Sequence, residues 1–398
     1  MNLEIVKIDD FGRGIGFIDG KVTFVPKSVV GDIVDVEIVK TKKKYNVAKI
    51  QRIIKPSLKR KNVCCPYFEK CGGCELLNIS YQNGLLYKKD KVVNYFKKNN
   101  LLITPKVIAN DQTYGYRNKI SLKAVDRKIG FFEAKSHSVL EIDKCLVAKD
   151  SINKVINFVK SIDIINGDIT IRSNYKDEIL LIIKSNDKLS IDLDKFKKLS
   201  GIGIIVNDKV IFGKSYFYEK IENLIYKVSY DSFFQVNLNV ATKMFNVIKK
   251  HIKEEDKILE LYSGVGAISL FVSSKAKSLL GMEIVNNAVI NANYNAKLNN
   301  INNASFVLED LKTGVKINNY EFNKLIVDPP RSGLSKDVLA FIENKKPQDI
   351  IYMSCDMQTL ARDVSFLKSM YEITDFYVGD MFSYTYHVEC VILLQRKD

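Results

Sequence analysis

The C-terminal half of the sequence predicts an α/β fold built on a doubly wound parallel sheet. Apolar runs that end at Asp328 and at Cys355 have the length and composition of strands buried on both faces. An earlier run, residues 257–262, leads into a glycine turn and then a helical segment, the usual first unit of such a sheet. Ligands bind outside the carboxyl ends of parallel strands, so these strand ends are expected to border one crevice.

Length, charge and hydropathy limit the class of protein. The 398 residues, 46% of them hydrophobic, suffice for two or three domains with buried cores. The net charge of +15 favours a polyanionic partner such as nucleic acid, although a Lys-rich solvated surface gives the same total. No apolar run approaches the roughly 18 residues of a membrane span, and the first residues lack a signal peptide's layout. We therefore expect a cytoplasmic protein with no membrane partner.

Residues 1–55 predict a small, OB-like β-barrel. Short β-prone runs separated by turns cover residues 3–8, 14–18, 21–25, 33–39 and 47–53. One expected hairpin carries Lys40, Lys42, Lys43, Lys44 and Tyr45, where cations can follow phosphates and the ring can stack on a base. Such a tip is otherwise a solvated loop, but Arg13 and the lysines near residue 60 extend the basic stretch. We expect this barrel to contact RNA.

A cysteine cluster follows the barrel. Cys65, Cys71 and Cys74 have C-x5-C-x2-C spacing, close enough in the chain for the thiolates to converge on one metal centre. Cys145 is the expected fourth ligand. In a reducing compartment cysteines are better explained as metal ligands, a nucleophile or packing than as disulfides. All-thiolate ligation allows zinc or a [4Fe-4S] cluster, and unliganded cysteines are the alternative.

Residues 56–228 predict a central α+β domain that includes these cysteines. A helix is expected over residues 80–99 with Ser80 as its N-cap, and another over residues 149–161. Short strands are expected over residues 119–125, 129–132, 168–172, 178–183 and 203–206. The Tyr116-Arg117-Asn118-Lys119 stretch either touches RNA or is solvated surface.

Residues 229–398 form the predicted catalytic domain. After a helix over residues 236–252, the strand over residues 257–262 turns at Gly264 and Gly266, where glycine lets the backbone approach a ligand. The next strand ends at Glu283, a position at which a carboxylate can hold ribose hydroxyls. The third glycine of the dinucleotide pattern is absent, because position 269 is Ser. S-adenosylmethionine (SAM) is therefore expected rather than NAD.

Later strand ends supply the remaining candidates. A strand over residues 304–308 precedes Asp310, which is placed to contact an adenine amino group. A hairpin over residues 373–378 and 388–394 would set Glu389 at the sheet edge beside the crevice. A cysteine that ends a buried strand is often only packing, as we expect of Cys390, but Cys355 lies beside two candidate carboxylates.

Three motifs resemble those of the RNA uracil-5-methyltransferase family: Asp328-Pro329-Pro330-Arg331, Ser354-Cys355-Asp356 and His387-Val388-Glu389. The resemblance extends over nearly the whole chain. The resemblance implies a SAM-dependent methyltransferase fold and a TRAM domain, an RNA-binding module, at the N-terminus. It implies Cys355 as nucleophile and Glu389 as base. Contacts with SAM or the target base are implied for Gln235, Tyr262, Glu283, Asp310 and Asp328.

The iron-sulfur branch of that family implies a [4Fe-4S] cluster on Cys65, Cys71, Cys74 and Cys145, with zinc as the second choice. By resemblance, the expected substrate is 23S ribosomal RNA; the alternatives are transfer RNA, or a non-catalytic RNA-binding or chaperone role. We expect no DNA partner and a monomer. The chain departs from the family where Ser383-Tyr384 replaces the Pro-His that is often found.

The chemistry explains why such residues are needed. Carbon 5 of uracil is too weakly nucleophilic to take a methyl group until a thiolate adds at carbon 6. A base must then remove the carbon 5 proton, and a carboxylate such as Asp328 can select uracil by accepting its N3–H. Arg331 can offset charge on the carbonyl oxygen, and the target must be unstacked.

Two related enzymes are disfavoured by Arg331. Cytosine-5 RNA methyltransferases place a second cysteine after a proline at the strand end where this chain has Pro329-Pro330-Arg331. N6-adenine methyltransferases follow Asp-Pro-Pro with an aromatic ring, and here Arg331 stands instead.

Overall fold

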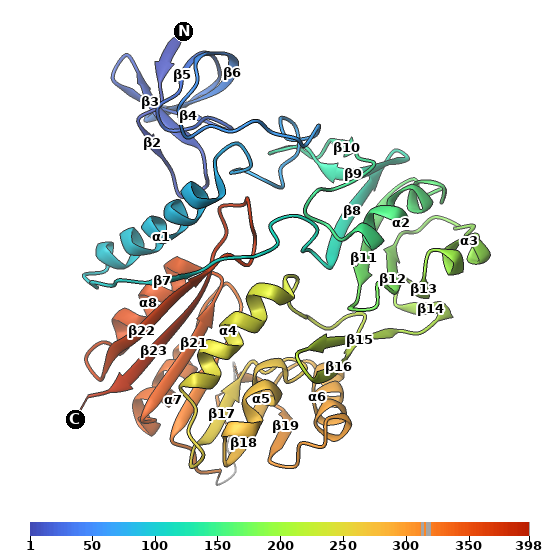
Figure 1. The fold of residues 1–398 in the computed structure, drawn as a ribbon, viewed down its shortest axis with the longest axis vertical. Helices are drawn as coiled ribbons and strands as arrows, with labels where there is room; N and C mark the ends of the chain where they lie inside the picture. The colour runs from blue at the N-terminus through green and yellow to red at the C-terminus, as the bar shows by residue number, and fades with distance from the viewer. Residues whose placement is uncertain (312–313, 316–319, 398) are drawn as a thin grey trace.

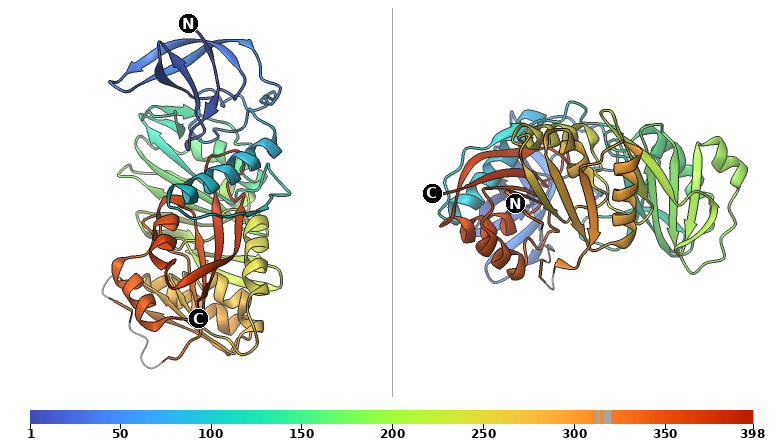
Figure 2. Two further views of the ribbon diagram at one scale, coloured as in Figure 1. Left: turned by 90° about the vertical axis from the view of Figure 1, so that its left-hand side faces the viewer. Right: turned by 90° about the horizontal axis from the view of Figure 1, so that it is seen from below.

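The computed structural model describes residues 1–311, 314–315 and 320–397 and has three parts (Figure 1). A barrel at the N-terminus sits at one end, a C-terminal sheet flanked by helices lies at the other, and a central sheet lies to one side between them (Figures 1 and 2). None of the described helices has the length and apolar composition that a membrane crossing requires.

The barrel is a six-stranded sheet with the order β1-β5-β6-β4-β3-β2. The run predicted as one strand over residues 3–8 is two, because the chain changes partner at Ile5: β1 pairs with β5, whereas β2 pairs with β3. Alternate side chains, among them Ile5, Val25 and Val34, fill its core. The strands are β1 (Asn2–Glu4), β2 (Lys7–Ile8), β3 (Gly14–Ile18), β4 (Lys21–Val25), β5 (Ile33–Thr41) and β6 (Tyr45–Lys55).

Helix α1 (Tyr81–Lys98) begins at the predicted cap, where Ser80 Oγ accepts a hydrogen bond from the Asn83 amide. Although the sequence suggested that this segment belongs to the central domain, α1 buries Val92 and Phe96 in the core of the C-terminal sheet. Strand β7 (Lys106–Ile108) then pairs in parallel with the last-but-one strand of that sheet. The segment from α1 to β7 therefore completes the C-terminal sheet (Figure 1).

The central sheet has the order β10-β9-β8-β11-β12-β13-β14. Helices α2 (Asp150–Lys160) and α3 (Leu193–Lys198) pack on it through a core of aliphatic residues and Phe158 and Phe196. The short strands β10 and β14 were not expected. The strands are β8 (Lys119–Val125), β9 (Lys128–Phe132), β10 (Val139–Glu141), β11 (Gly167–Ser173), β12 (Ile179–Lys184), β13 (Gly201–Val206) and β14 (Lys209–Gly213).

A hairpin and a helix join the central sheet to the C-terminal one. The hairpin consists of β15 (Tyr216–Ile221) and β16 (Leu224–Ser229), and α4 (Leu238–Lys250) follows it. Their buried side chains share one core with residues of both sheets. The two sheets are therefore held in a fixed relation across the space between them.

The C-terminal sheet has the order β19-β18-β17-β20-β21-β23-β22-β7, which confirms the predicted doubly wound fold. Its first five members are parallel, and β23 runs antiparallel between β21 and β22. The strands are β17 (Lys257–Leu261), β18 (Ser278–Glu283), β19 (Ala304–Leu308), β20 (Lys324–Val327), β21 (Asp349–Ser354), β22 (Tyr371–Gly379) and β23 (Glu389–Arg396). The helices are α5 (Ala267–Val272), with the 3-10 turn η1 (Ser273–Lys275), α6 (Asn286–Leu298), α7 (Lys336–Lys345) and α8 (Met357–Leu367).

Candidate active site

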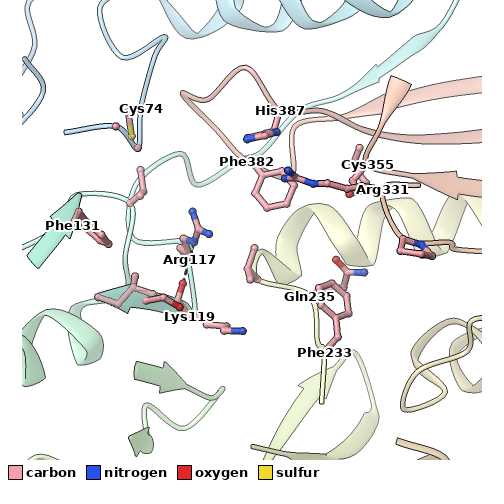
Figure 3. Close-up of a pocket in the computed structure, with 18 of the residues that line it drawn as sticks. Cys74, Arg117, Lys119, Phe131, Phe233, Gln235, Arg331, Cys355, Phe382 and His387 are labelled. Atoms are coloured by element: carbon pink, nitrogen blue, oxygen red, sulfur yellow. Dashed lines mark hydrogen bonds between the residues drawn. The ribbon is translucent and has the colours of Figure 1, made fainter. Parts of the chain in front are cut away.

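A cavity of about 1410 Å³ lies between the central sheet and the carboxyl ends of the C-terminal sheet. Figure 3 shows Arg117, Lys119 and Phe131 on one side and Gln235, Arg331 and Cys355 on the other. Small-molecule sites usually enclose about 300–1,000 Å³. This cavity is therefore large enough for a cofactor together with part of a second ligand.

One end of the cavity is the turn after β17. Tyr262 has φ +65° and Gly264 has φ +54°, and a Cβ added to Gly264 would meet no atom within 4 Å. A left-handed turn that leaves open space beside its backbone is a cradle for a ligand. The carboxylate of Glu283 closes the turn, since Oε2 accepts a hydrogen bond of 2.9 Å from the Gly264 amide.

Glu283 is oriented by two more amides. Its Oε1 accepts hydrogen bonds of 2.9 Å from both Ile284 and Val285. An ionised carboxylate has about four acceptor sites, so one remains for a ribose hydroxyl. Asp310 lines the same end of the cavity. The residues at this end fit the nucleoside of SAM.

Gly266 is the predicted cofactor residue that the cavity lining does not include. Its φ is +80°, and a Cβ there would stand 2.7 Å from the Phe306 ring. The glycine is needed because the chain turns sharply into α5 against a packed side chain. It supports the cradle without facing the ligand space.

The three candidate catalytic residues lie at adjacent strand ends. Asp328 follows β20, Cys355 follows β21, and Glu389 opens β23. The antiparallel register pairs Ser354 with Cys390, which sets Cys355 and Glu389 side by side at one edge. All three line the cavity, and Glu389 is only 5% exposed.

Burial controls the protonation of this group. Burial raises the pKa of Asp328 to about 7, and burial together with the charge of Asp328 raises the pKa of Glu389 well above its usual range. Burial and the neighbouring carboxylates of Glu389 and Asp328 raise the pKa of Cys355 to about 11, while Arg331 acts in the opposite direction. In the unliganded protein the Cys355 thiol is therefore mostly protonated at neutral pH, burial favours the protonated form of Glu389, and Arg331 is the cation that favours the thiolate.

The loop that bears Arg331 is tied to α8. Thr359 Oγ1 donates to the Arg331 carbonyl at 3.2 Å, and Arg362 donates to the carbonyls of Ser332 and Leu334 at 3.1 and 3.2 Å. Gly333 has φ +72°, and a Cβ on it would meet Arg362 at 2.7 Å. The Asp328 strand end and the Cys355 strand end are thus fixed relative to each other.

Phe233 was not identified from the sequence. Its ring is 68% exposed and lines the cavity, two residues before the predicted Gln235, which also lines it and is 7% exposed. An exposed ring in a cavity offers a stacking surface. The only signal in the sequence is a large apolar residue just before a helix, which is also consistent with packing.

The sequence left open whether the stretch around Arg117 contacts RNA or is solvated surface. In the structure this stretch lies at the cavity. Arg117 and Lys119 line it, and Asn118 Nδ2 donates to the Gln235 carbonyl at 3.1 Å. Burial, with repulsion from Arg172 and Arg117, lowers the pKa of Lys119 to about 8. This cationic wall of the central sheet faces the catalytic strand ends across the cavity (Figure 3).

His387, the first residue of the His387-Val388-Glu389 motif, is also part of the cavity wall. It lines the cavity and contacts the rings of Tyr386 and Phe382, with centroid separations of 4.2 and 6.0 Å. Burial, with repulsion from Arg331, lowers its pKa to about 4. The imidazole is therefore neutral at neutral pH.

The four candidate metal ligands also line the cavity, and Figure 3 shows Cys74 on the side of Phe131 and Arg117, away from Cys355. They are Cys65, Cys71, Cys74 and Cys145. Among the described residues, no group of three or more His, Cys, Asp or Glu side chains has the geometry to hold a metal ion. The expected convergence on one ion is therefore not seen.

The thiols are nevertheless neighbours. Burial raises the pKa of Cys71, Cys74 and Cys145, and the charges of the other candidate cysteines raise each of these pKa values further. As a donor set, four half-buried thiols without hydroxyl or carboxylate ligands among them suit a thiophilic group.

Comparison with known proteins agrees with this geometry. The family model described as tRNA (Uracil-5-)-methyltransferase matches residues 80–397, and the TRAM domain model matches residues 1–50. Uncharacterized RNA methyltransferases of Clostridium acetobutylicum and Clostridium tetani are 32% and 31% identical, each over 99% of this chain and over 97% and 95% of their own lengths. A crystal structure of Pyrococcus abyssi tRNA (uracil-54, C5)-methyltransferase in complex with S-adenosyl-L-homocysteine is 26% identical, with TM-score 0.81, covering 99% of this chain and 100% of that chain.

Proposed function

The chain belongs to the tRNA (uracil-5-)-methyltransferase family, and from that premise we propose that it transfers a methyl group from SAM to carbon 5 of a uridine in RNA. The observation that carries the proposal is the shared cavity. Cys355 and Glu389 open into the same space as the cradle at Gly264. A nucleophile, a base and a cofactor turn thus face one position that an unstacked base can occupy.

The chain's own residues perform the proton and thiol steps. Cys355 Sγ adds to carbon 6 of uracil, and the ring electrons move to the carbon 4 oxygen. When bound at the Tyr262–Gly264 turn, SAM would supply the electrophilic methyl group that carbon 5 accepts and would leave as S-adenosylhomocysteine. Glu389 then takes the carbon 5 proton, the carbon 6–sulfur bond breaks, and the Cys355 thiolate is released.

Asp328 and Arg331 set the conditions for these steps. The ionised Asp328 accepts the N3–H of uracil, a donor that cytosine lacks. Arg331 stabilises the Cys355 thiolate and offsets charge on the carbonyl oxygen. Burial raises the pKa of Glu389 and favours its protonated form, so the ionised carboxylate is the form that can act as the base.

Replacement of the base provides the test. Glu389→Gln should stop turnover after methyl transfer and trap the protein on RNA, seen as a shifted band that resists denaturants. Glu389→Gln combined with Cys355→Ala is the matched control and should give no such band. A trapped band that survives loss of Cys355 would reject the assignment.

We propose that Cys65, Cys71, Cys74 and Cys145 hold a [4Fe-4S] cluster, with zinc as the second candidate. The support is the all-thiol donor set on one cavity wall and the resemblance to the iron-sulfur branch. When bound, the cluster would supply a fixed cross-link between the cysteine loop and the central sheet. Iron and zinc assays on anaerobically purified protein decide between the two: full zinc occupancy without iron would exclude the cluster.

For the RNA class, we propose 23S ribosomal RNA, again from resemblance to the iron-sulfur branch, and for the location we propose the cytoplasm. Transfer RNA is the second candidate, since the Pyrococcus neighbour is a tRNA enzyme. Mass mapping of methylated fragments from a deletion strain distinguishes them. Loss of 5-methyluridine from tRNA alone would overturn the ribosomal assignment.

A further inference from the structure

Aromatic and cationic side chains form a continuous ladder between the N-terminal barrel and the cavity. Phe24 and Tyr45 lie 5.5 Å apart between ring centroids, and the Arg13 guanidinium lies 4.2 Å from the Phe24 centroid and 5.5 Å from that of Phe11. Phe11 lies 5.7 Å from Tyr386, whose ring contacts His387 in the cavity wall. We call this series the aromatic ladder: Tyr45, Phe24, Arg13, Phe11, Tyr386 and His387.

The loop that bears Phe11 and Arg13 is held in place by a hydrogen bond and an ion pair rather than by burial of the Phe11 ring. The Tyr87 hydroxyl of α1 donates to the Asp9 carbonyl at 2.9 Å, and Asp9 forms an ion pair with Arg13 at 2.5 Å. These contacts fix the loop between β2 and β3, yet the Phe11 ring is 54% exposed. A large ring that is both fixed and exposed is suited to contact a flat apolar ligand.

Cations border the ladder. Lys91 of α1 lies 4.9 Å from the Tyr386 centroid. Lys135, which lines the cavity, lies near Arg13 and Lys40 of the barrel: partial burial and repulsion from Arg13 and Lys40 lower its pKa, while Asp9 has the opposite effect. Cations from the barrel and the central domain that repel one another form a site for an anion.

We propose that the aromatic ladder and Lys91 and Lys135 form the track for single-stranded RNA that flanks the target base, leading from the Tyr45 end of the barrel to the cavity. Exposed rings interleaved with cations are what an unpaired strand requires, because bases stack on rings and phosphates pair with cations. The proposal rests on the proposed function in taking RNA as the substrate. It also assigns the ring of the predicted basic hairpin, Tyr45, to the outer end of the track.

A matched pair of ring substitutions tests the track in the full-length protein. The probe is a labelled single-stranded RNA of about ten nucleotides with one uridine, within the site size of such modules. Phe11→Ala should raise its Kd about fivefold or more, the equivalent of one lost stacking contact. Phe17→Ala is the control, because Phe17 is 55% exposed on β3 of the same barrel and has no ring or cation partner among the described residues. Equal effects of the two substitutions would overturn the proposal.

The cation is tested separately. Lys135→Gln should reduce the salt dependence of log Kd by about 0.7, as expected for one lost phosphate contact on a single strand. Lys128→Gln, an exposed lysine at the other end of β9, should leave the slope unchanged. If Lys135→Gln leaves the slope unchanged, Lys135 makes no phosphate contact, and the proposed course of the RNA past Lys135 is wrong.

Cross-linking distinguishes RNA contact by the aromatic ladder from a purely structural role in which the ladder only holds the barrel against the rest of the protein. RNA carrying 5-iodouridine next to the target uridine should cross-link to Phe11 or Tyr386, as mapped by mass spectrometry of the peptides. Cross-links that fall only on the Phe17 side of the barrel would overturn the proposal. If the protein methylates no uridine but these cross-links form, the proposed function fails and the track stands. If it methylates RNA and neither cross-links nor loss of affinity appear, only the track fails.

Discussion

The two ends of the cavity are built in different ways. At the catalytic end, Asp328, Cys355 and Glu389 each stand at the end of a strand in one hydrogen-bonded sheet. At the other end, Cys65, Cys71 and Cys74 lie on a loop that has only isolated bridges, such as Cys71 with Glu133. Strand ends fix side chains through the register of the sheet, whereas a loop of thiols needs a bound group or side-chain packing to fix it.

The two ends are connected by the segment between β22 and β23. Tyr384, in the position where this chain departs from the family pattern, belongs to a buried hydrophobic cluster against which Cys65, Cys74 and Cys145 pack. Five residues later the same segment reaches Glu389. Its geometry is set by Asp380, which lies 2.5 Å from the buried Lys88 ammonium and accepts a hydrogen bond of 2.8 Å from the Tyr81 hydroxyl.

The largest expected effect breaks the catalytic end alone. Cys355→Ala should lower kcat about 10³-fold or more, because no other group can add to carbon 6, while RNA and SAM binding remain. Cys390→Ala is the control: this thiol is fully buried against Met357 and should cost only about 1 kcal/mol of stability. Methyl transfer from labelled SAM measures the activity of both variants, and urea unfolding measures their stability. Comparable loss of activity in both variants would contradict the difference in their roles.

The next prediction concerns the segment between β22 and β23, which connects the two ends of the cavity. Lys88→Met leaves the Asp380 carboxylate buried without its cation, so the free energy of unfolding should fall by about 3–5 kcal/mol in urea titrations. Lys97→Met, on the exposed side of the same helix, should change it by less than about 0.5 kcal/mol. A small effect at Lys88 would mean that the segment is held mainly by its other contacts.

A smaller effect is expected when the charge of Arg331, which lowers the pKa of Cys355 at the catalytic end, is removed. Arg331 lowers the pKa of the Cys355 thiol, so Arg331→Gln should raise that pKa further. Since the reaction needs the thiolate, log(kcat/KM) rises with pH up to that pKa, and the curve should move to higher pH. At neutral pH, kcat/KM should fall about tenfold for each unit of pKa. Arg331→Lys keeps the charge and should retain the wild-type profile; an unshifted curve for the Gln variant would contradict the prediction.

The smallest effect concerns the cysteine end. In protein that carries the proposed cluster, removing iron by anaerobic chelation should speed amide hydrogen exchange over residues 64–74, because the loop then loses its cross-link. Strands β20 and β21 should exchange as before, since their ladder is independent of it. Hydrogen exchange with mass spectrometry measures both. Equal changes in hydrogen exchange over residues 64–74 and over β20 and β21 would show that both regions depend on the bound iron.

Periodic sequence features predicted most of the fold. The buried runs before Asp328 and Cys355, the Ser80 cap and the glycine turn each carry a local signal. The same logic placed Asp328, Cys355 and Glu389 at one edge of the sheet. It does not separate Gly266 from Gly264, because a packing glycine and a ligand-facing glycine have the same sequence pattern.

Other features depend on partners far along the chain. Lys88 lies four residues before Val92 on the buried face of α1, and its partner Asp380 is 292 positions away. Glu260 lies in a buried strand, where burial raises its pKa to about 8 and Ser269 donates hydrogen bonds to it. The local sequence around either residue does not identify its partner, so only the assembled structure shows its role.

The pairing of β7 with β22 has a consequence for synthesis of the chain. Lys106 bonds to Asp375, a separation of 269 residues, so at about 5–20 residues per second the ribosome needs tens of seconds between the two. Until then Phe96 lacks the Phe376 ring of β22, whose centroid lies 4.9 Å away in the folded protein. The nascent protein carries the Val92 and Phe96 face of α1 without this partner through most of its translation, and the enzyme is completed only as its final strands emerge.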